Sequence, residues 1–211
     1  MAKWSSTILL APVLVAVAAC AGCGSAPKSD EAPLSAMADT SAHTSTQIEA
    51  IRRTWQAVAD GELTHEAARE ALKRVVWARS RWEGVRRAAI ETLLEDQEYI
   101  ADTRNMLRLM LPTETQWPII EFICTTAADR DWRELTASMV RSWSRPVVDP
   151  PDNERPERLA LQKLYPDLQV EDVVFRVFIG EGVLESEFRE RDRRDAWTLL
   201  QRIDPRGQRT L

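Results

Sequence analysis

Apolar residues recur at spacings of three and four positions along most of the chain from residue 47 onward. Ile48, Ile51, Trp55 and Val58 form the first of these stripes. This period matches one face of an α-helix, whereas a half-buried strand would alternate every second residue. The pattern therefore predicts an all-α fold of short antiparallel helices, each burying one apolar face.

Glycine and proline divide the stripes into short segments. Gly61, Pro112 and Gly180 each follow an apolar stripe, where a helix is expected to end. The segment 170–179 is rich in strand-forming residues, but a single strand would have no partner, so we expect a buried helix there. The expected helices also include 103–111, 115–128, 156–165 and 186–203.

Three helix starts are predicted from capping residues. Thr64 precedes an apolar stripe that continues to about residue 78 and is expected to be an N-cap. The pairs Ser80/Glu83 and Asp131/Glu134 have the spacing of a capping box, in which each residue bonds the backbone amide of the other. These pairs predict helices that begin at Ser80 and Asp131.

One segment breaks the helical pattern. Residues 144–155 contain Pro146, Pro150 and Pro151, which remove backbone donors and disfavour helix in the preceding residues. We expect an extended connection here within a single helical domain that spans residues 47–211.

The segment from Val85 to Leu94 reads Val-Arg-Arg-Ala-Ala-Ile-Glu-Thr-Leu-Leu. It resembles the second half of a HEAT repeat, and the resemblance extends over residues 63–96. In that family, paired-helix units of about 40 residues stack into a solenoid. The resemblance implies a HEAT-like solenoid fragment, while the downstream helix pairs lack the signature residues and favour an irregular helical bundle.

The N-terminus has the composition of an export signal. Lys3 precedes an apolar run of about 12 residues, which is too short for a membrane-spanning helix of roughly 20, and Pro12 interrupts it. Val17-Ala18-Ala19 then leads into Cys20, and Cys20-Ala21-Gly22 leads into Cys23. Both registers resemble the lipobox of bacterial lipoproteins, and we favour Cys20 over Cys23 because of the aliphatic Val17.

That resemblance implies cleavage after residue 19 and acylation of Cys20, or of Cys23 in the alternative register. The protein would then be anchored by its lipid to a membrane of the cell envelope, either at the periplasmic face or in the outer membrane. Residues 20–46 contain few large apolar side chains and many Ser, Ala, Pro and Thr residues. We expect them to form a disordered tether between the acyl group and the helical domain.

Composition limits the classes of ligand. The formal net charge is −5, which disfavours binding to nucleic acid. His43 and His65 lie far apart in polar surroundings, so a zinc site built from Cys and His is not expected, and no cofactor is predicted. Cys124 lies in an apolar helical segment and is predicted to be a buried thiol.

Known catalytic patterns are not recognisable. The chain has seven glycines and contains neither a phosphate-binding glycine loop nor a Gly-x-Ser-x-Gly motif. The carboxylate pairs Glu95/Asp96 and Glu171/Asp172 are adjacent in sequence, so their side chains do not converge on one site from a single helix. An enzyme is therefore not the expected class.

Eight tryptophans are an unusual number for a chain of 211 residues. Trp55 and Trp143 lie on apolar stripes and are predicted to be core residues. Arg141, Trp143 and Arg145 border the proline-rich connection, and they are the residues that we would expect at a partner surface, with the arginines binding carboxylates. The sequence thus favours an envelope lipoprotein whose helical domain is a protein-interaction or scaffold module. The alternative is an envelope enzyme or a glycan-binding protein that uses scattered carboxylates and tryptophans.

Overall fold

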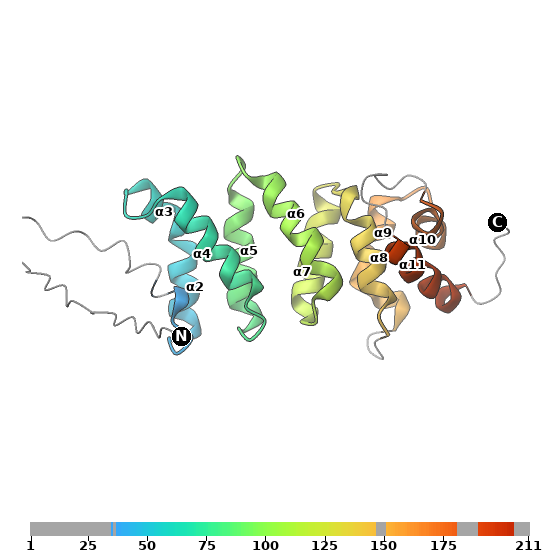
Figure 1. Ribbon diagram of the computed structural model, residues 1–211, viewed down its shortest axis with the longest axis horizontal. Helices are drawn as coiled ribbons and strands as arrows, with labels where there is room; N and C mark the ends of the chain where they lie inside the picture. Colours follow the sequence, from blue (N-terminus) through green and yellow to red (C-terminus); the bar gives the residue numbers. More distant parts are fainter. Residues whose placement is uncertain (1–34, 36, 147–150, 181–189, 205–211) are drawn as a thin grey trace, which may run out of the picture.

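The computed structural model describes residues 35, 37–146, 151–180 and 190–204, and this part of the chain is all-α (Figure 1). It contains no strand within these ranges. The α-helices are α2 (Thr44–Arg52), α3 (Thr54–Ala59), α4 (His65–Trp77), α5 (Glu83–Glu95), α6 (Ile100–Met110), α7 (Trp117–Asp129), α8 (Thr136–Ser144), α9 (Pro156–Leu164), α10 (Val170–Ile179) and α11 (Glu190–Ile203). Three 3₁₀ turns accompany them: η1 (Leu111–Thr113), η2 (Arg133–Leu135) and η3 (Asp152–Glu154). The predicted all-α class is confirmed.

The helices follow one another along the long axis of an elongated molecule (Figure 1). One layer is formed by α2, α5, α7 and α9, each of which contacts the next. In the other layer, α8 contacts η1 on one side and α11 on the other. Two pairs of consecutive helices, α4 with α5 and α8 with α9, contact each other and join the two layers. Stacking of such pairs buries the apolar faces of the helices.

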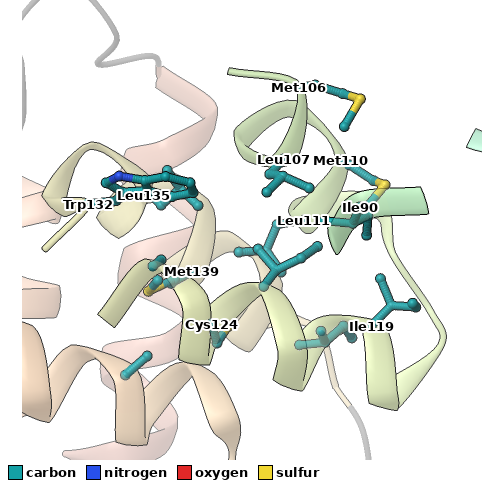
Figure 2. Packing of buried hydrophobic residues seen from close by; sticks show 14 of the residues in the cluster. Ile90, Met106, Leu107, Met110, Leu111, Ile119, Cys124, Trp132, Leu135 and Met139 are labelled. Atoms are coloured by element: carbon teal, nitrogen blue, oxygen red, sulfur yellow. The ribbon is translucent and has the colours of Figure 1, made fainter. Parts of the chain in front are cut away.

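The main apolar core runs through the stacked pairs, and a small second cluster consists of Ala57, Leu63 and Ala68. In the central part of the main core, Leu107 of α6 and Leu111 of η1 lie over Ile119 of α7, while Met139 of α8 approaches from the other side (Figure 2). Cys124 lies at the same level, fully buried, and its thiol is free. The prediction of a buried thiol is confirmed.

Left-handed residues end three helices. Gly61 and Gly180 have φ angles of 72° and 79°, which glycine adopts without steric cost, and they terminate α3 and α10 as predicted. Asp131, with φ of 52°, ends α7 in the same way, and the Trp132 amide donates to the Ala127 carbonyl. This bond is the outer hydrogen bond of a Schellman motif.

The Schellman motif explains why the predicted capping box at Asp131/Glu134 is wrong. Asp131 closes the preceding helix, so it cannot also cap the next one, and α8 begins after η2 at Thr136. Glu134 instead forms an ion pair with Arg104.

The predicted capping box at Ser80/Glu83 is also wrong, because α5 begins at Glu83. The Gln116 side-chain amide donates to the carbonyls of Arg79 and Arg81 at 3.2 and 3.1 Å. These two bonds fix residues 79–81 as a turn that precedes α5, so the turn is not part of the helix. The predicted N-cap at Thr64 is confirmed, since its hydroxyl accepts from the Ala67 amide at 3.2 Å.

The packed part of the chain starts earlier than residue 47. Helix α2 begins at Thr44, and the Met37 side chain is 1% exposed within the main core. The Thr54 hydroxyl lies 3.5 Å from the Met37 sulfur. Met37 is one of the few large apolar residues of the predicted tether, and burying it removes that surface from water. The predicted signal peptide, together with Cys20 and Cys23, lies outside the described residues.

No helix among the described residues is both long enough and apolar enough to cross a membrane. The predicted helix at 170–179 is confirmed as α10, whose Val173, Val174 and Val177 are buried. The predicted extended connection at 144–155 begins after α8 and is described only at its two ends, where η3 precedes α9.

Burial raises the pKa of the Cys124 thiol well above its usual range, and the carboxylate of Glu157 acts in the same direction. A chain that begins at Ser25 has Cys124 as its one cysteine. We expect this thiol to react with Ellman's reagent at least 100-fold more slowly in the native protein than in guanidinium, measured by absorbance. Equal rates in the two conditions would contradict the buried position.

Candidate functional site

The structure places the three residues of the predicted partner surface in internal contacts. Trp143 is fully buried, and its indole nitrogen donates to Asp152 at 2.9 Å. Arg141 forms ion pairs with Asp192 and Asp195 of α11 at 3.2 and 3.5 Å. Trp143 is therefore a core residue, as its position in the apolar stripe predicted, and its ring is not exposed for a partner.

Arg145, the third of these residues, terminates α8. Its guanidinium donates to the carbonyl and the hydroxyl of Ser142 at 3.2 and 3.1 Å. Burial lowers the pKa of Arg145 from its ordinary value, and the nearby carboxylate of Glu157 opposes this shift. The Arg145 side chain thus satisfies a carbonyl in the last turn of its own helix, where a positive charge is also favoured by the helix dipole.

A fully buried ion pair joins the first helix pairs. Arg86 of α5 and Glu114 have side chains with no exposed surface, and the two groups meet in two hydrogen bonds of 3.1 and 2.5 Å. The same guanidinium donates to the Val76 carbonyl at the end of α4 and to the Gln116 side chain. Arg86 therefore holds the end of α4, the first turn of α5 and the loop before α7 together.

The charge on Glu114 is supported from several directions. Burial opposes ionisation, but hydrogen bonds from Arg86 and from the amides of Gln116 and Thr115 outweigh it and lower the pKa of Glu114. The stabilisation is therefore present above the ordinary pKa of a glutamate and is lost as the pH falls through the lowered folded value.

A second buried ion pair lies between α8 and α9. Arg155 donates to both carboxylate oxygens of Glu157 at 3.1 and 2.8 Å, and the Ser142 hydroxyl donates to the same carboxylate at 2.7 Å. The Arg155 guanidinium also lies 5.4 Å from the centre of the Trp117 ring at the start of α7. This cation–π contact fixes Trp117 at the seam between α7 and α9.

His65 lies in an aromatic cluster that the sequence did not reveal. Its imidazole stacks on Trp55 and meets Tyr99, with ring centres 5.1 and 5.2 Å apart. Its Nε2 lies 3.2 Å from Asp96, whose buried carboxylate also pairs with Arg69. A histidine held by a carboxylate is also found in nucleophilic sites, where a hydroxyl or thiol bonds the other ring nitrogen. No such bond to His65 exists among the described residues, and the cluster joins α3, α4 and the turn after α5.

The other tryptophans that the structure describes range from buried to exposed, and Trp55 is half-buried. Trp132 is buried, and the Trp55 indole nitrogen donates to the Thr92 carbonyl at 2.7 Å. Trp77, Trp82 and Trp197 are exposed, at 43, 54 and 45% of their surface. They belong to three different segments: α4, the turn before α5, and α11.

An open groove of about 200 Å³ follows the seam between α7 and α9. Its α7 side extends from the first residue of the helix to the last, and its α9 side extends from η3 to Lys163. Several lining side chains are small, and Leu159 lines the groove with 53% of its surface exposed. The lining residues are Trp117, Glu121, Thr125, Ala128, Asp129, Glu154, Pro156, Leu159, Ala160 and Lys163.

The groove carries an excess of negative charge. Lys163 forms an ion pair with Asp129 across the seam. Glu121 and Glu154 are exposed, and neither has a partner among the described residues. The sequence reasoning missed this groove because α7 and α9 are neighbours only in the fold. The spacing of Trp117, Glu121 and Thr125 on one helical face was the one available signal.

Within the described ranges, no group of three or more His, Cys, Asp or Glu side chains could hold a metal ion. Cys20 and Cys23, the predicted acylation residues, lie outside these ranges.

The buried ion pair can be tested with two neighbouring arginines. Arg86→Met leaves Glu114 buried without its partner, and we expect the free energy of unfolding to fall by about 3–5 kcal/mol. The control is Arg87→Met, because Arg87 forms an exposed ion pair with Glu91 that contributes roughly 0.2–1 kcal/mol. The free energy of unfolding of both variants is measured by urea denaturation followed by circular dichroism. Equal decreases in the two variants would contradict a special role for the buried ion pair.

The groove and the two buried ion pairs are thus the main polar features of the described fold. Comparison of the chain with protein-family models, with curated proteins and with solved structures finds no match.

Proposed function

We propose that this chain is a lipid-anchored protein-interaction or scaffold module of the bacterial cell envelope. The observation that carries the interaction part is the open groove along α7 and α9, in which Glu121 and Glu154 have no partner among the described residues. A groove of this kind, between rigid helices, is a typical site for a segment of another protein. The anchoring part is supported by the lipobox-like residues that end at Cys20.

The stacking of helix pairs supports the proposal of a HEAT-like scaffold. In such arrays each pair contacts its neighbours, and long continuous surfaces form along each layer. The layer α2, α5, α7 and α9 has this arrangement, and the groove lies on it. Because buried ion pairs hold successive helix pairs in fixed positions, the surface is preorganised and loses little entropy on binding.

The anchor is tested by replacing each candidate cysteine. We expect Cys20→Ala to prevent acylation and release the protein from membranes, while Cys23→Ala leaves it in the membrane fraction. Mass spectrometry of the mature N-terminus should find acylated Cys20 in the unaltered chain. Acylation of Cys23 with retention of Cys20→Ala in the membrane would show that the other register is used. Unmodified protein in solution would refute the anchor.

The interaction function is tested by capture from detergent-solubilised envelopes. Two baits are compared: the full chain and a soluble version that begins at Ser25. We expect both to recover the same partner protein, identified by mass spectrometry, because the binding surface belongs to the helical domain. An unrelated envelope lipoprotein serves as the control bait. Recovery of no specific partner with either version would count against an interaction module.

A further inference from the structure

The groove along α7 and α9 has the length and the side chains of a helix-binding site. Helix α7 has 13 residues, and at 1.5 Å per residue the groove is roughly 20 Å long. That length fits three turns of an α-helix. Thr125, Ala128 and Ala160 line the groove and have small side chains, which leave room for the close approach of a second backbone.

Two apolar side chains provide the anchoring contacts. Leu159 exposes about half of its surface on α9, a position at which it contributes little to the core. Trp117 lines the other side and is held in place by the cation–π contact with Arg155. Arg155 is in turn fixed by its buried bonds to Glu157, so the ring needs no rearrangement before a ligand binds.

The charges flanking the groove select the partner. Among the described residues that line the groove, Glu121, Asp129 and Glu154 are acidic, and the basic residue Lys163 already pairs with Asp129. Glu121 and Glu154, which have no partner in the described part of the chain, favour a ligand that carries positive charge beside its apolar stripe. An acidic helix would place like charges together at the same positions.

We propose that this groove binds a cationic amphipathic α-helix of a partner protein, with its apolar residues against Trp117 and Leu159 and its lysine or arginine residues beside Glu121 and Glu154. The inference rests on the proposed interaction function and names the chemistry of the partner at that site. It goes further in assigning a role to each of these four side chains.

The test uses the full acylated chain in phosphatidylcholine nanodiscs, with empty nanodiscs as the baseline. The probe is a fluorescent synthetic helix of about 14 residues, with leucines on one stripe and lysines on both flanks. A matched peptide has glutamate in place of every lysine. Fluorescence anisotropy should show binding of the lysine peptide, and the glutamate peptide should bind at least tenfold more weakly.

Variants locate the site. Glu121→Lys combined with Glu154→Lys should weaken binding of the lysine peptide about tenfold or more. The control is Glu62→Lys combined with Glu98→Lys, which makes the same change in net charge at exposed positions outside the groove and should leave binding unchanged. Thr125→Trp fills the groove without altering its charge and should also weaken binding. Melting curves by circular dichroism establish that each variant is folded.

Several results would overturn the inference. Equal weakening by the two charge-reversal pairs would mean that the peptide responds only to net charge. Binding unaffected by Thr125→Trp would place the peptide elsewhere. Sedimentation that shows concentration-dependent self-association, lost in the Glu121→Lys and Glu154→Lys variant, would make a second copy of this chain the occupant.

The outcome is separable from that of the proposed function. If envelope partners are captured equally by the unaltered chain and by the Glu121→Lys and Glu154→Lys variant, the interaction function stands and the groove assignment fails. If the lysine peptide binds in the groove but no envelope partner is captured by any version, the groove assignment stands and the interaction function fails.

Discussion

The ion pair between Arg86 and Glu114 is the constraint on which the arrangement of the first helix pairs depends. Removing both charges from water costs several kcal/mol each, and this cost is offset only when every donor and acceptor is satisfied. Arg86 meets this condition through Glu114, Gln116 and the Val76 carbonyl. Arg86 lies in α5 and its partners lie at the end of α4 and in the loop before α7, so a shift of any one of these three segments would leave a buried charge without its partner. The ion pair therefore specifies relative position more than it adds net stability.

The same design recurs at the next pair of helices. Arg155 and Glu157 are buried between α8 and α9, and Ser142 provides the additional hydrogen bond. At the C-terminal side, Arg202 of α11 donates to the Trp143 and Ser144 carbonyls and pairs with Asp152. An arginine thus closes the carbonyl end of α8 from a distant helix. Because such contacts fix the spacing of whole helix pairs, the seam between α7 and α9 has a defined width.

Features of the fold that depend on residues close together in the sequence were predicted correctly. Apolar periodicity indicated the all-α class and most helices, and Gly61, Gly180 and Thr64 marked boundaries correctly. The predicted starts at Ser80 and Asp131 were wrong because tertiary contacts decide these turns, through Gln116 in one case and through the end of α7 in the other.

The candidate site was harder to predict than the fold. Arg86 and Arg155 are charged residues that would ordinarily be assigned to the surface, and their burial depends on partners 28 and 2 positions away. The groove needs two helices whose adjacency no local pattern reveals.

The burial of Met37, in the middle of the predicted tether, has a further consequence for the proposed anchor at Cys20. The 17 residues from Cys20 to Met37 can span at most roughly 60 Å when fully extended. The N-terminal end of the helical array would therefore stay within that distance of the bilayer. A partner protein bound at this end of the array would lie close to the membrane surface.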